Sequence, residues 1–371
     1  MSTDSKLIKV LVLMQQKSLD ALIVYSNGTS HILRPAYFHF LSGIHPLGPN
    51  NAVIISRDGK AILLVEPEWD AARASRKSWL NDVRGSSNFT GDLENILRAL
   101  NIRGTIGIAS LNEMTEAVYS VVSRVATVKP ADAIIETMAR EKDDSRINNV
   151  KKSAQIADAG FKALLENTQV GVREYELAAE AGYAMRAAGA DDVFMFISTE
   201  KHNYALHSPT DKKLANGDIV IVEMAPFCDG QCVQICRSIV LGEASPILME
   251  KYKLLTFAFE ESLKQVKPGI PAYMMSRTMN KIISEAGYAE YCRPPHMRAR
   301  GHGFGAGSIA PGALIDDDTS EMLEPYQVVV PHPNQYFPET GYLACGETVM
   351  LTETGMERLF DTETRLYVKG Q

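Results

Sequence analysis

The chain has 371 residues, of which 45% are hydrophobic and 22% are charged, and its formal net charge at pH 7 is −7. This length favours two domains over a single core, and the composition is ordinary for a globular protein. Because the charge is mildly acidic and no basic run occurs, neither nucleic acid nor an anionic membrane is an expected partner.

The N-terminal segment lacks the layout of a secretory signal, and no stretch approaches the roughly 20 apolar residues that span a membrane. All five cysteines lie in the second half of the chain: Cys228, Cys232, Cys236, Cys292 and Cys345. An odd number of cysteines without a secretion signal predicts free thiols in a reducing cytoplasm. The first three recur every four residues but straddle a turn, and they match no zinc-ligand pattern.

The first part of the chain alternates helix and strand signals. Apolar periodicity predicts a helix at residues 5–16, and short apolar runs predict strands at residues 21–25, 52–56 and 61–65. Further helices are expected at residues 93–100 and 114–125, with a strand at residues 105–109 between them. This alternation predicts a smaller α/β domain over residues 1–138.

The second part mixes helices with antiparallel hairpins. The expected helices are a long one in the charged stretch after residue 139, and three more at residues 174–188, 250–266 and 272–285. Strands are expected at residues 327–330 and 348–352. Because no regular strand–helix repeat occurs, residues 139–371 are predicted to form an α+β domain.

A predicted hairpin at residues 217–241 lies at the centre of this domain. Asp229-Gly230 suits a two-residue turn with positive φ angles. That loop length sets the register of the two strands, with the expected pairs Cys228–Gln231, Ala225–Gln234 and Glu223–Cys236. Since side chains alternate along a strand, the last four of these residues share one face of the hairpin.

Glu223 interrupts an apolar run that otherwise reads as a buried strand. A carboxylate there needs a partner, because an isolated buried charge is very costly. A nearby arginine would make Glu223 a structural residue, whereas a bound ligand would make it a functional one. The hairpin alone does not distinguish these two interpretations.

Three histidines stand in Gly- or Pro-constrained segments of the second part: His207 in ALHSPTD, His302 in GHGFG and His332 in VVVPHPN. A lone histidine is more often structural, but three of them beside an in-strand glutamate favour a functional site. Neutral imidazole serves as a general base or a metal ligand near pH 7.

GHGFGAG is not a phosphate-binding loop, because it has no Lys-Ser/Thr pair and no clear strand before it. Cys236 is either a nucleophile beside His207 or a small buried residue.

The order of several segments resembles the creatinase, prolidase and methionine-aminopeptidase superfamily, known for its pita-bread fold. The segments are LHSPTDKKLANGDIVIVEMAP, CRSIVLGE, GHGFG, VVVPHPN and GETVMLTETG. The resemblance implies an α+β pita-bread catalytic domain at residues 139–371, preceded by a creatinase-type α/β domain at residues 1–138. It also implies a homodimer.

Metallopeptidases of this superfamily bind two metal ions through two Asp, one His and two Glu. Carried over position by position, these five places hold Glu223, Gln234, His302, His332 and Gly346. Two adjacent dications need several anionic oxygens to offset their repulsion, and this set supplies a single carboxylate. The second histidine of the peptidase relatives is replaced by Ile309. The expectation from the sequence is therefore that no metal cofactor is bound.

Creatinase of this superfamily hydrolyses a C–N bond with side chains alone. Its essential histidine matches His207, and the histidine of its Gly-rich segment matches His302. Creatine itself is disfavoured as a substrate, because the carboxylates that hold its guanidinium fall at Cys236 and His332. Ectoine hydrolases are similar in two places, with a Glu at the position of Glu223 and a His at the position of His332.

The resemblance thus predicts a metal-independent hydrolase of a non-peptide C–N bond, an amide or amidine, in a small molecule. His207 is the expected general base and then acid, and Glu223 is expected to hold a cationic or N–H-bearing part of the substrate. His302 and His332 are expected to stabilise the tetrahedral centre. The expected substrate-binding residues are Gln234, Cys236, Glu347 and His45, with residues 45–51 closing the pocket of the partner subunit in a homodimer.

Three alternatives stay open. One divalent metal ion held by Glu223, His302 and His332 would give the common set of two His and one carboxylate. An Xaa-Pro-type peptidase with unusual ligands is the second alternative. The third is a non-catalytic pita-bread protein that binds a small molecule or a peptide, although a binding surface has no need of three positioned histidines.

Overall fold

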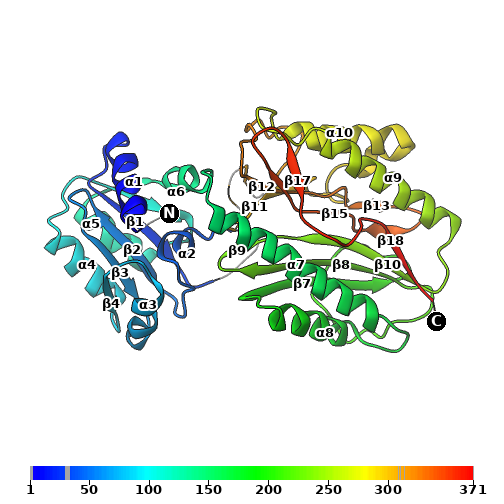
Figure 1. The fold of residues 1–371 in the computed structure, drawn as a ribbon, viewed down its shortest axis with the longest axis horizontal. Helices are drawn as coiled ribbons and strands as arrows, with labels where there is room; N and C mark the ends of the chain where they lie inside the picture. The colour runs from blue at the N-terminus through cyan, green and yellow to red at the C-terminus, as the bar shows by residue number, and fades with distance from the viewer. Residues whose placement is uncertain (1–2, 30–33, 308, 310, 313, 371) are drawn as a thin grey trace. The chain divides into compact units, whose positions relative to one another are not determined.

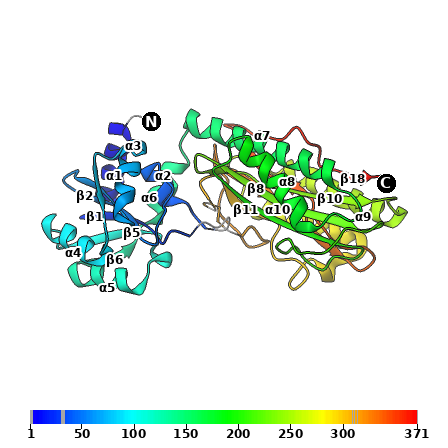
Figure 2. The same cartoon turned by 90° about the horizontal axis from the view of Figure 1, so that it is seen from below.

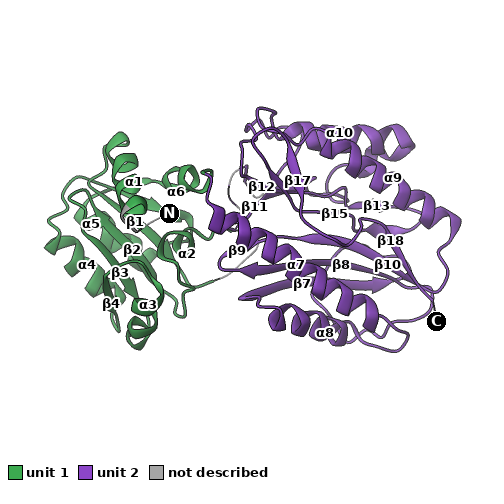
Figure 3. Cartoon of the chain, in the orientation of Figure 1, with its two compact units in different colours: residues 1–141 green, residues 142–371 purple. Residues whose placement is uncertain are grey.

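The computed structural model describes residues 3–29, 34–307, 309, 311–312 and 314–370. The chain divides into two compact units, Met1–Glu141 and Lys142–Gln371 (Figure 3). The expected boundary was three residues earlier, between residues 138 and 139. Each unit has its own buried apolar core. In the described part of the chain, no helix is long and apolar enough to cross a membrane.

The first unit is built on a six-stranded mixed sheet in the order β4-β3-β2-β1-β5-β6 (Figure 1). Its strands are β1 (Ala21–Ser26), β2 (Asn51–Ser56), β3 (Ala61–Val65), β4 (Asp82–Gly85), β5 (Thr105–Ala109) and β6 (Thr127–Pro130). The central strand β1 pairs antiparallel with β2 and parallel with β5. Because β1 and β2 are buried at every position, both faces of the sheet must be covered.

Helices provide this cover. One face is covered by α4 (Phe89–Ala99) and α5 (Glu116–Val125). Leu93 of α4 and Val122 of α5 share a core with Ile23 of β1. The other helices of the unit are α1 (Thr3–Gln16), α2 (Tyr37–Ser42), α3 (Ala71–Lys77) and α6 (Asp132–Ala139), with short turns at Glu68–Asp70 and Leu111–Glu113. Figure 2 shows α1, α2 and α6 on the opposite side of the sheet from α4 and α5.

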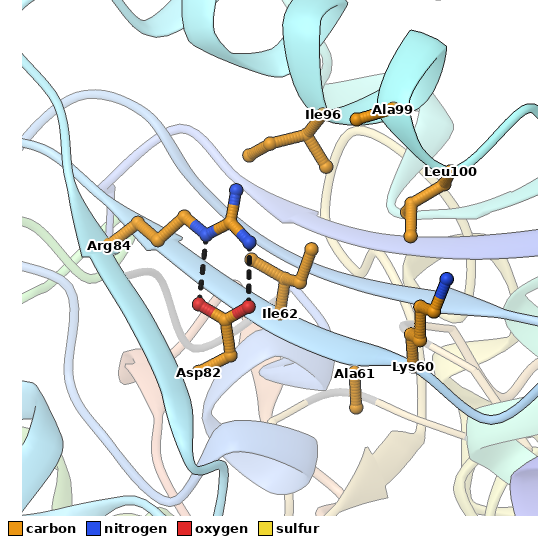
Figure 4. A pocket seen from close by; sticks show the side chains of 8 residues that line it. All are labelled: Lys60, Ala61, Ile62, Asp82, Arg84, Ile96, Ala99 and Leu100. Carbon is orange, nitrogen blue, oxygen red and sulfur yellow. Dashed lines mark hydrogen bonds and ion pairs between the residues drawn. The ribbon is translucent and has the colours of Figure 1, made fainter.

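A surface pocket of about 340 Å³ lies in the first unit between β3, β4 and α4 (Figure 4). Ile62, Ile96 and Leu100 supply its apolar lining. Asp82 and Arg84 form an ion pair with two hydrogen bonds, so their charges offset each other. None of the site residues expected from the sequence lines this pocket.

The larger sheet of the second unit has six strands. Four of them follow the order β15-β10-β8-β7, and β18 lies beside β10 and β9 beside β8. Its strands are β7 (Asp192–Glu200), β8 (Ile219–Cys228), β9 (Gln231–Cys232), β10 (Ile235–Leu241), β15 (Gly346–Glu347) and β18 (Leu366–Lys369). A second sheet has the order β11-β12-β16-β17, and β13 pairs with β14 in a small hairpin. These strands are β11 (Gly301–Phe304), β12 (Val328–Pro331), β13 (Gln335–Phe337), β14 (Gly341–Leu343), β16 (Val349–Leu351) and β17 (Met356–Arg358).

Both faces of the larger sheet are covered by helices (Figure 1). The helices are α7 (Asp144–Asn167), α8 (Glu174–Ala187), α9 (Pro246–Leu263) and α10 (Tyr273–Ile283), followed by helical turns at Ser284–Tyr288 and Ala289–Tyr291. Phe161 of α7 shares a core with Val222 of β8, while Phe259 of α9 shares another with Ile221. Since Ile221 and Val222 are neighbours on one strand, their side chains point to opposite faces.

The central hairpin forms with the register that its turn predicted. Asp229 and Gly230 have φ angles of 47° and 71°, which is the left-handed region that a tight two-residue turn requires. Two of the three expected pairs occur in the ladder, namely Cys228–Gln231 and Glu223–Cys236. The prediction of this hairpin is confirmed in its turn and in the placement of Glu223.

The third expected pair, Ala225–Gln234, does not occur as a ladder pair, because Gln234 lies between β9 and β10. Its backbone N–H donates instead to Thr348 Oγ1 at 2.7 Å, and its carbonyl accepts from the Thr348 backbone N–H at 2.9 Å. Gln234 is thereby tied to the segment that follows β15.

Candidate active site

Six polar residues from three segments of the second unit gather at the β8–β10 ladder. They are called the Glu223 cluster here: Glu223, Gln234, Cys236, His302, His332 and Asn334. Glu223 Oε1 accepts hydrogen bonds from Cys236 Sγ at 3.2 Å and from Asn334 Nδ2 at 3.2 Å. Gln234 Nε2 donates to Cys236 Sγ at 3.4 Å. The face of the hairpin predicted to be functional therefore carries a connected polar network.

Strand pairing brings the two histidines to this network. Cys236 pairs with Gly346 across the β10–β15 ladder, and Gly346 packs directly against His332. His332 follows β12, whose Val330 pairs with His302 of β11. The two imidazole rings are 5.6 Å apart between centroids. The predicted residues Glu223, Gln234, Cys236, His302 and His332 are thus brought together by the fold.

Burial sets the protonation of the groups on the hairpin. It raises the pKa of the Glu223 carboxyl, while hydrogen bonds from Cys236, Asn334 and Gln234 act in the opposite direction. Burial and the neighbouring Glu223 raise the pKa of the Cys236 thiol well above its usual value. Because the thiolate is the nucleophilic form, Cys236 is not suited to the role of nucleophile that the sequence left open.

Both histidines of the cluster are neutral at pH 7. Burial lowers the pKa of His302 to about 4 and that of His332 to about 3, and each is further lowered by the nearby Arg298. His302 Nδ1 donates to the Gly303 carbonyl at 3.0 Å, because a carbonyl can only accept. This bond fixes the tautomer and leaves a lone pair on His302 Nε2.

Two buried atoms of the cluster have no hydrogen-bond partner among the described residues, Gln234 Oε1 and His332 Nδ1. The two side chains are 1% and 9% exposed, respectively. In folded proteins, buried polar atoms are almost always paired. The cluster therefore has unused hydrogen-bonding capacity on two of its residues.

His207 lies at the surface of the second unit. Its backbone N–H donates to Ser198 Oγ on β7 at 2.9 Å, and its ring Nδ1 donates to the Ser208 carbonyl at 2.8 Å. The ring thus has a lone pair on Nε2 that can accept a proton. No hydrogen bond between described residues joins His207 directly to the Glu223 cluster.

Glu347 has a different environment from the one expected of a substrate-binding residue. Its Oε2 accepts from Arg237 Nη2 at 2.7 Å and from Thr364 Oγ1 at 2.6 Å, and its Oε1 accepts from Arg358 Nε at 2.9 Å. Arg237 and Glu347 are both fully buried. Because both carboxylate oxygens are engaged by the protein, Glu347 anchors β15 to the C-terminal segment.

His45 belongs to the first unit, where its ring lies 4.1 Å from that of His39 between centroids. Arg73 Nη2 donates to the His45 backbone carbonyl at 2.7 Å. The expected contribution of His45 to a partner subunit's site depends on assembly and stays a prediction.

Sequence reasoning missed two residues of the site, Asn334 and Tyr342. Asn334 Oδ1 accepts from the Cys345 backbone N–H at 2.8 Å while its amide donates to Glu223, so it ties the carboxylate to the chain before β15. Tyr342 of β14 lies near Glu223 and Cys236, and burial raises the pKa of its phenol. Asn334 stands two residues after His332 in the constrained PHPN segment, which was the available signal. Tyr342 had none.

The five places of the superfamily's metal ligands do not fit two metal ions. Glu223 supplies the single carboxylate, Gln234 is neutral, and Gly346 has no side chain. A Cβ built at Gly346 would lie 2.7 Å from His332 Cα and Cβ and 2.5 Å from the Pro331 carbonyl oxygen. His332 therefore occupies the room that a carboxylate side chain at position 346 would need.

The described residues do not form a preformed site for a single metal ion either. Within residues 3–29, 34–307, 309, 311–312 and 314–370, no three His, Cys, Asp or Glu side chains are close enough together to hold an ion. Glu223, His302 and His332 thus do not form the three-ligand set considered from the sequence.

Comparison with known proteins identifies the class of this chain. The model of metallopeptidase family M24 matches residues 148–353. An Xaa-Pro dipeptidase from Pyrococcus furiosus is 27% identical over 364 residues, covering 97% of this chain and 99% of the relative. An Xaa-Pro dipeptidase from Pyrococcus horikoshii is 25% identical over 366 residues, covering 98% and 99%.

Solved structures give the same picture for the fold. The prolidase from Pyrococcus horikoshii superimposes with a TM-score of 0.84 at 25% identity, covering 97% of this chain and 99% of that one. An X-Pro aminopeptidase from Thermotoga maritima superimposes with a TM-score of 0.86 at 22% identity, covering 98% and 99%. The α+β pita-bread fold and the superfamily predicted from the sequence are confirmed.

These comparisons also correct the predicted chemistry. The expectation that the chain is an enzyme is supported, but the assignment to a creatinase-like branch acting on non-peptide C–N bonds is wrong, because the relatives are Xaa-Pro dipeptidases. The expectations of metal independence and of no cofactor are likewise overturned by the class, which is that of metallopeptidases. That class implies divalent metal ions, which the ligand places of this chain do not fit. Since the family model covers more than half of its residues, the protein belongs to metallopeptidase family M24.

Proposed function

We propose that the chain is a peptidase of the Xaa-Pro type that binds and cleaves small dipeptides at the Glu223 cluster. The relatives named Xaa-Pro dipeptidase match almost the whole chain, including the first unit. The observation that carries the proposal is the hydrogen-bonded network around Glu223, with His332 packed against Gly346 beside it and the His302 ring 5.6 Å from that of His332.

The residues of the cluster have complementary roles in this proposal. Glu223 and Gln234 bind and orient the dipeptide, and Asn334 and Cys236 fix the Glu223 carboxylate through hydrogen bonds to Oε1. His302 and His332 are neutral imidazoles that hydrogen-bond the reacting amide. His207 takes a proton from the attacking water at its Nε2 and passes it to the leaving nitrogen, so that a C–O bond to the carbonyl carbon forms and the C–N bond breaks.

A substrate panel tests this proposal. Ala-Pro, Gly-Pro and Ala-Ala are incubated with the full-length protein, and free proline or alanine is quantified by chromatography. Parallel reactions contain added Mn²⁺, added Co²⁺ or a chelator, and a relative of the Xaa-Pro dipeptidase type is the positive control. We expect proline release from Ala-Pro and Gly-Pro and much slower cleavage of Ala-Ala. The absence of proline release under all metal conditions would contradict the proposal.

We further propose that the protein acts as a homodimer in the cytoplasm, with residues 45–51 of one subunit closing the site of the other. The five free thiols suit a reducing compartment. Sedimentation velocity tests the assembly, with a species of twice 40.8 kDa expected. A monomer at assay concentration, with full activity, would contradict it.

A further inference from the structure

Arg300 is a fully buried arginine that lies immediately before β11. A guanidinium group inside a protein is costly unless its donors are paired. All three nitrogens of Arg300 have partners: Nε donates to Asn280 Oδ1 at 2.7 Å, Nη1 to the Asn334 carbonyl at 3.0 Å, and Nη2 to Gln335 Oε1 at 2.7 Å and to Cys292 Sγ at 3.4 Å. The side chain is therefore held in one orientation, although no step of the proposed reaction uses it.

The hydrogen bonds of Arg300 hold the segment that carries two residues of the Glu223 cluster. Its backbone carbonyl accepts from the His332 N–H at 3.0 Å, and its guanidinium group binds the Asn334 carbonyl two residues later. Asn334 in turn donates to Glu223 Oε1 at 3.2 Å and accepts from the Cys345 N–H at 2.8 Å. A displacement of the Asn334 backbone would therefore move a hydrogen-bond donor of the Glu223 carboxylate.

A helix anchors the other side of Arg300. Asn280 lies on α10, and its amide donates to Asp317 Oδ1 at 2.9 Å. Ser276, one turn earlier on the same helix, donates to the same oxygen at 2.6 Å. The guanidinium group is planar and presents its donors in a fixed fork, so it can bind several acceptors at once in a defined geometry. Arg300 thus connects α10 to residues 332–335 through a rigid group.

We infer that Arg300 is a positioning residue of the proposed active site, which acts through Asn334 on the Glu223 carboxylate. This inference rests on the proposed function, because it takes Glu223 to bind the dipeptide. The competing explanation is that Arg300 only stabilises the fold. In that case its loss would affect the whole second unit rather than the segment around Asn334.

Hydrogen–deuterium exchange followed by mass spectrometry tests the inference without any substrate. Arg300→Met keeps the length of the side chain and removes all of its donors. We expect the peptide that contains the Cys345 amide to exchange at least about tenfold faster in the variant, because the acceptor of this amide, Asn334 Oδ1, is no longer held in place. The peptide over residues 174–187 of α8 should be unchanged. Faster exchange in both peptides, or unchanged exchange at Cys345, would overturn the inference.

Steady-state kinetics with Ala-Pro separates a displaced Glu223 from a loss of folded protein. A smaller folded fraction lowers the apparent kcat and leaves KM unchanged, whereas displacement of a binding group raises KM. We expect Arg300→Met to raise KM at least about fivefold. Arg300→Lys keeps the charge and one donor, so its KM should rise about twofold to threefold, and it provides a second variant if Arg300→Met does not fold.

Arg277→Met is the matched control for these variants. Arg277 is an exposed arginine on α10 whose Nε donates to the Asp317 carbonyl at 2.9 Å and whose guanidinium group lies over the Tyr273 ring. Its substitution should leave KM within about twofold of the wild type. A lowered kcat with unchanged KM in both Arg300 variants would show a structural role and would contradict the inference.

A double-mutant cycle tests whether Arg300 acts through Asn334. In the Asn334→Ala background, Arg300→Met should raise KM by less than about twofold, because the two substitutions interrupt the same connection to Glu223. Independent effects of the two substitutions on KM would contradict the inferred route.

The outcomes separate this inference from the proposed function. If the wild type releases no proline from Ala-Pro, the peptidase proposal fails, and the exchange rate at Cys345 in Arg300→Met still decides whether Arg300 holds Asn334 in place. Proline release by the wild type together with an unchanged exchange rate at Cys345 in Arg300→Met would overturn the inference and leave the peptidase proposal standing.

Discussion

At the scale of single residues, Gly346 and His332 decide what the site can hold. Position 346 has a φ of 135°, a conformation that L-amino acids with a side chain rarely adopt. Its neighbour His332 fills the adjacent space. Because His332 fills this space, a carboxylate side chain placed at position 346 would have no room to act as a metal ligand.

The strain at this position gives a stability prediction. Gly346→Ala should lower the free energy of unfolding by about 2–3 kcal/mol, because the new Cβ meets the Pro331 carbonyl and His332 in an unfavourable backbone conformation. Gly355→Ala is the matched control, since the nearest atom to its Cβ is 4.0 Å away, and its effect should stay within about 0.5 kcal/mol. Urea unfolding followed by far-ultraviolet circular dichroism measures both. Equal effects of the two substitutions would contradict this account of Gly346.

The proton-transfer role proposed for His207 predicts a kinetic effect. His207→Ala should lower kcat for Ala-Pro by about 10²–10⁴-fold and change KM little, because general acid–base catalysis contributes on that order. His296→Ala is the control, since that histidine stacks on Tyr336 and has no proposed role in proton transfer. Initial rates of proline release measure both variants. Full activity of His207→Ala would remove His207 from the mechanism.

At the scale of secondary-structure elements, the sequence predicted the hairpin and missed strands that depend on tertiary contacts. The Asp229-Gly230 turn and the apolar run around Glu223 are local signals, and they set the register that the structure shows. By contrast, β11 consists of Gly301–Phe304, a glycine-rich segment with little intrinsic strand preference. Its pairing with β12 brings His302 beside His332, and no local pattern in the sequence encodes that pairing.

The same limit applies to Glu347, which was expected to bind substrate. Its partners Arg237 and Arg358 come from β10 and β17, so only the tertiary fold reveals that its oxygens are engaged. Local sequence cannot distinguish a buried carboxylate paired by distant arginines from one that faces a ligand. Five of the six residues of the Glu223 cluster were identified from local signals, namely the hairpin register and the Gly- and Pro-constrained segments around the two histidines. The resemblance to a superfamily added the long-range information that these segments belong to one site.

The buried pair gives a prediction for how these elements are held together. Glu347→Gln should lower the free energy of unfolding by about 3–5 kcal/mol, because it leaves the fully buried Arg237 without its counter-charge. Glu261→Gln breaks an exposed i,i+3 pair with Lys264 on α9, and its cost should be below about 1 kcal/mol. Both are measured by urea unfolding. A small effect of Glu347→Gln would mean that the pair contributes little to anchoring β15.

At the scale of the whole molecule, the two units have separate cores and can be probed separately. Both tryptophans, Trp69 and Trp79, lie in the first unit, so tryptophan fluorescence reports on that unit. The first unit also contains His39, whose pKa is lowered to about 3 by burial, with His45, Lys6 and Lys77 acting in the same direction. Unfolding exposes this imidazole and restores a pKa near 6.5.

This difference predicts an acid-sensitive first unit. Between pH 6.5 and about 3 the unfolded state binds a proton at His39 that the folded state does not, so stability falls as the pH falls through this window. At pH 5 the loss relative to pH 7.5 is about 2 kcal/mol from His39 alone. Urea unfolding followed by tryptophan fluorescence at the two pH values measures it. His39→Phe should reduce the difference between the pH values by that amount, and an unchanged difference would show that His39 is not responsible.

We propose that this member of family M24 cleaves Xaa-Pro dipeptides at the Glu223 cluster, although its residues do not fit the two metal ions of the superfamily. The most direct test is proline release from Ala-Pro by the wild type and by Glu223→Gln, with the metal content of the same samples determined by inductively coupled plasma mass spectrometry. We expect proline release by the wild type, a loss of at least about tenfold in Glu223→Gln because the dipeptide loses a charged binding partner, and fewer than two metal equivalents per chain. Undiminished release by Glu223→Gln, or activity that depends on two bound equivalents, would contradict it.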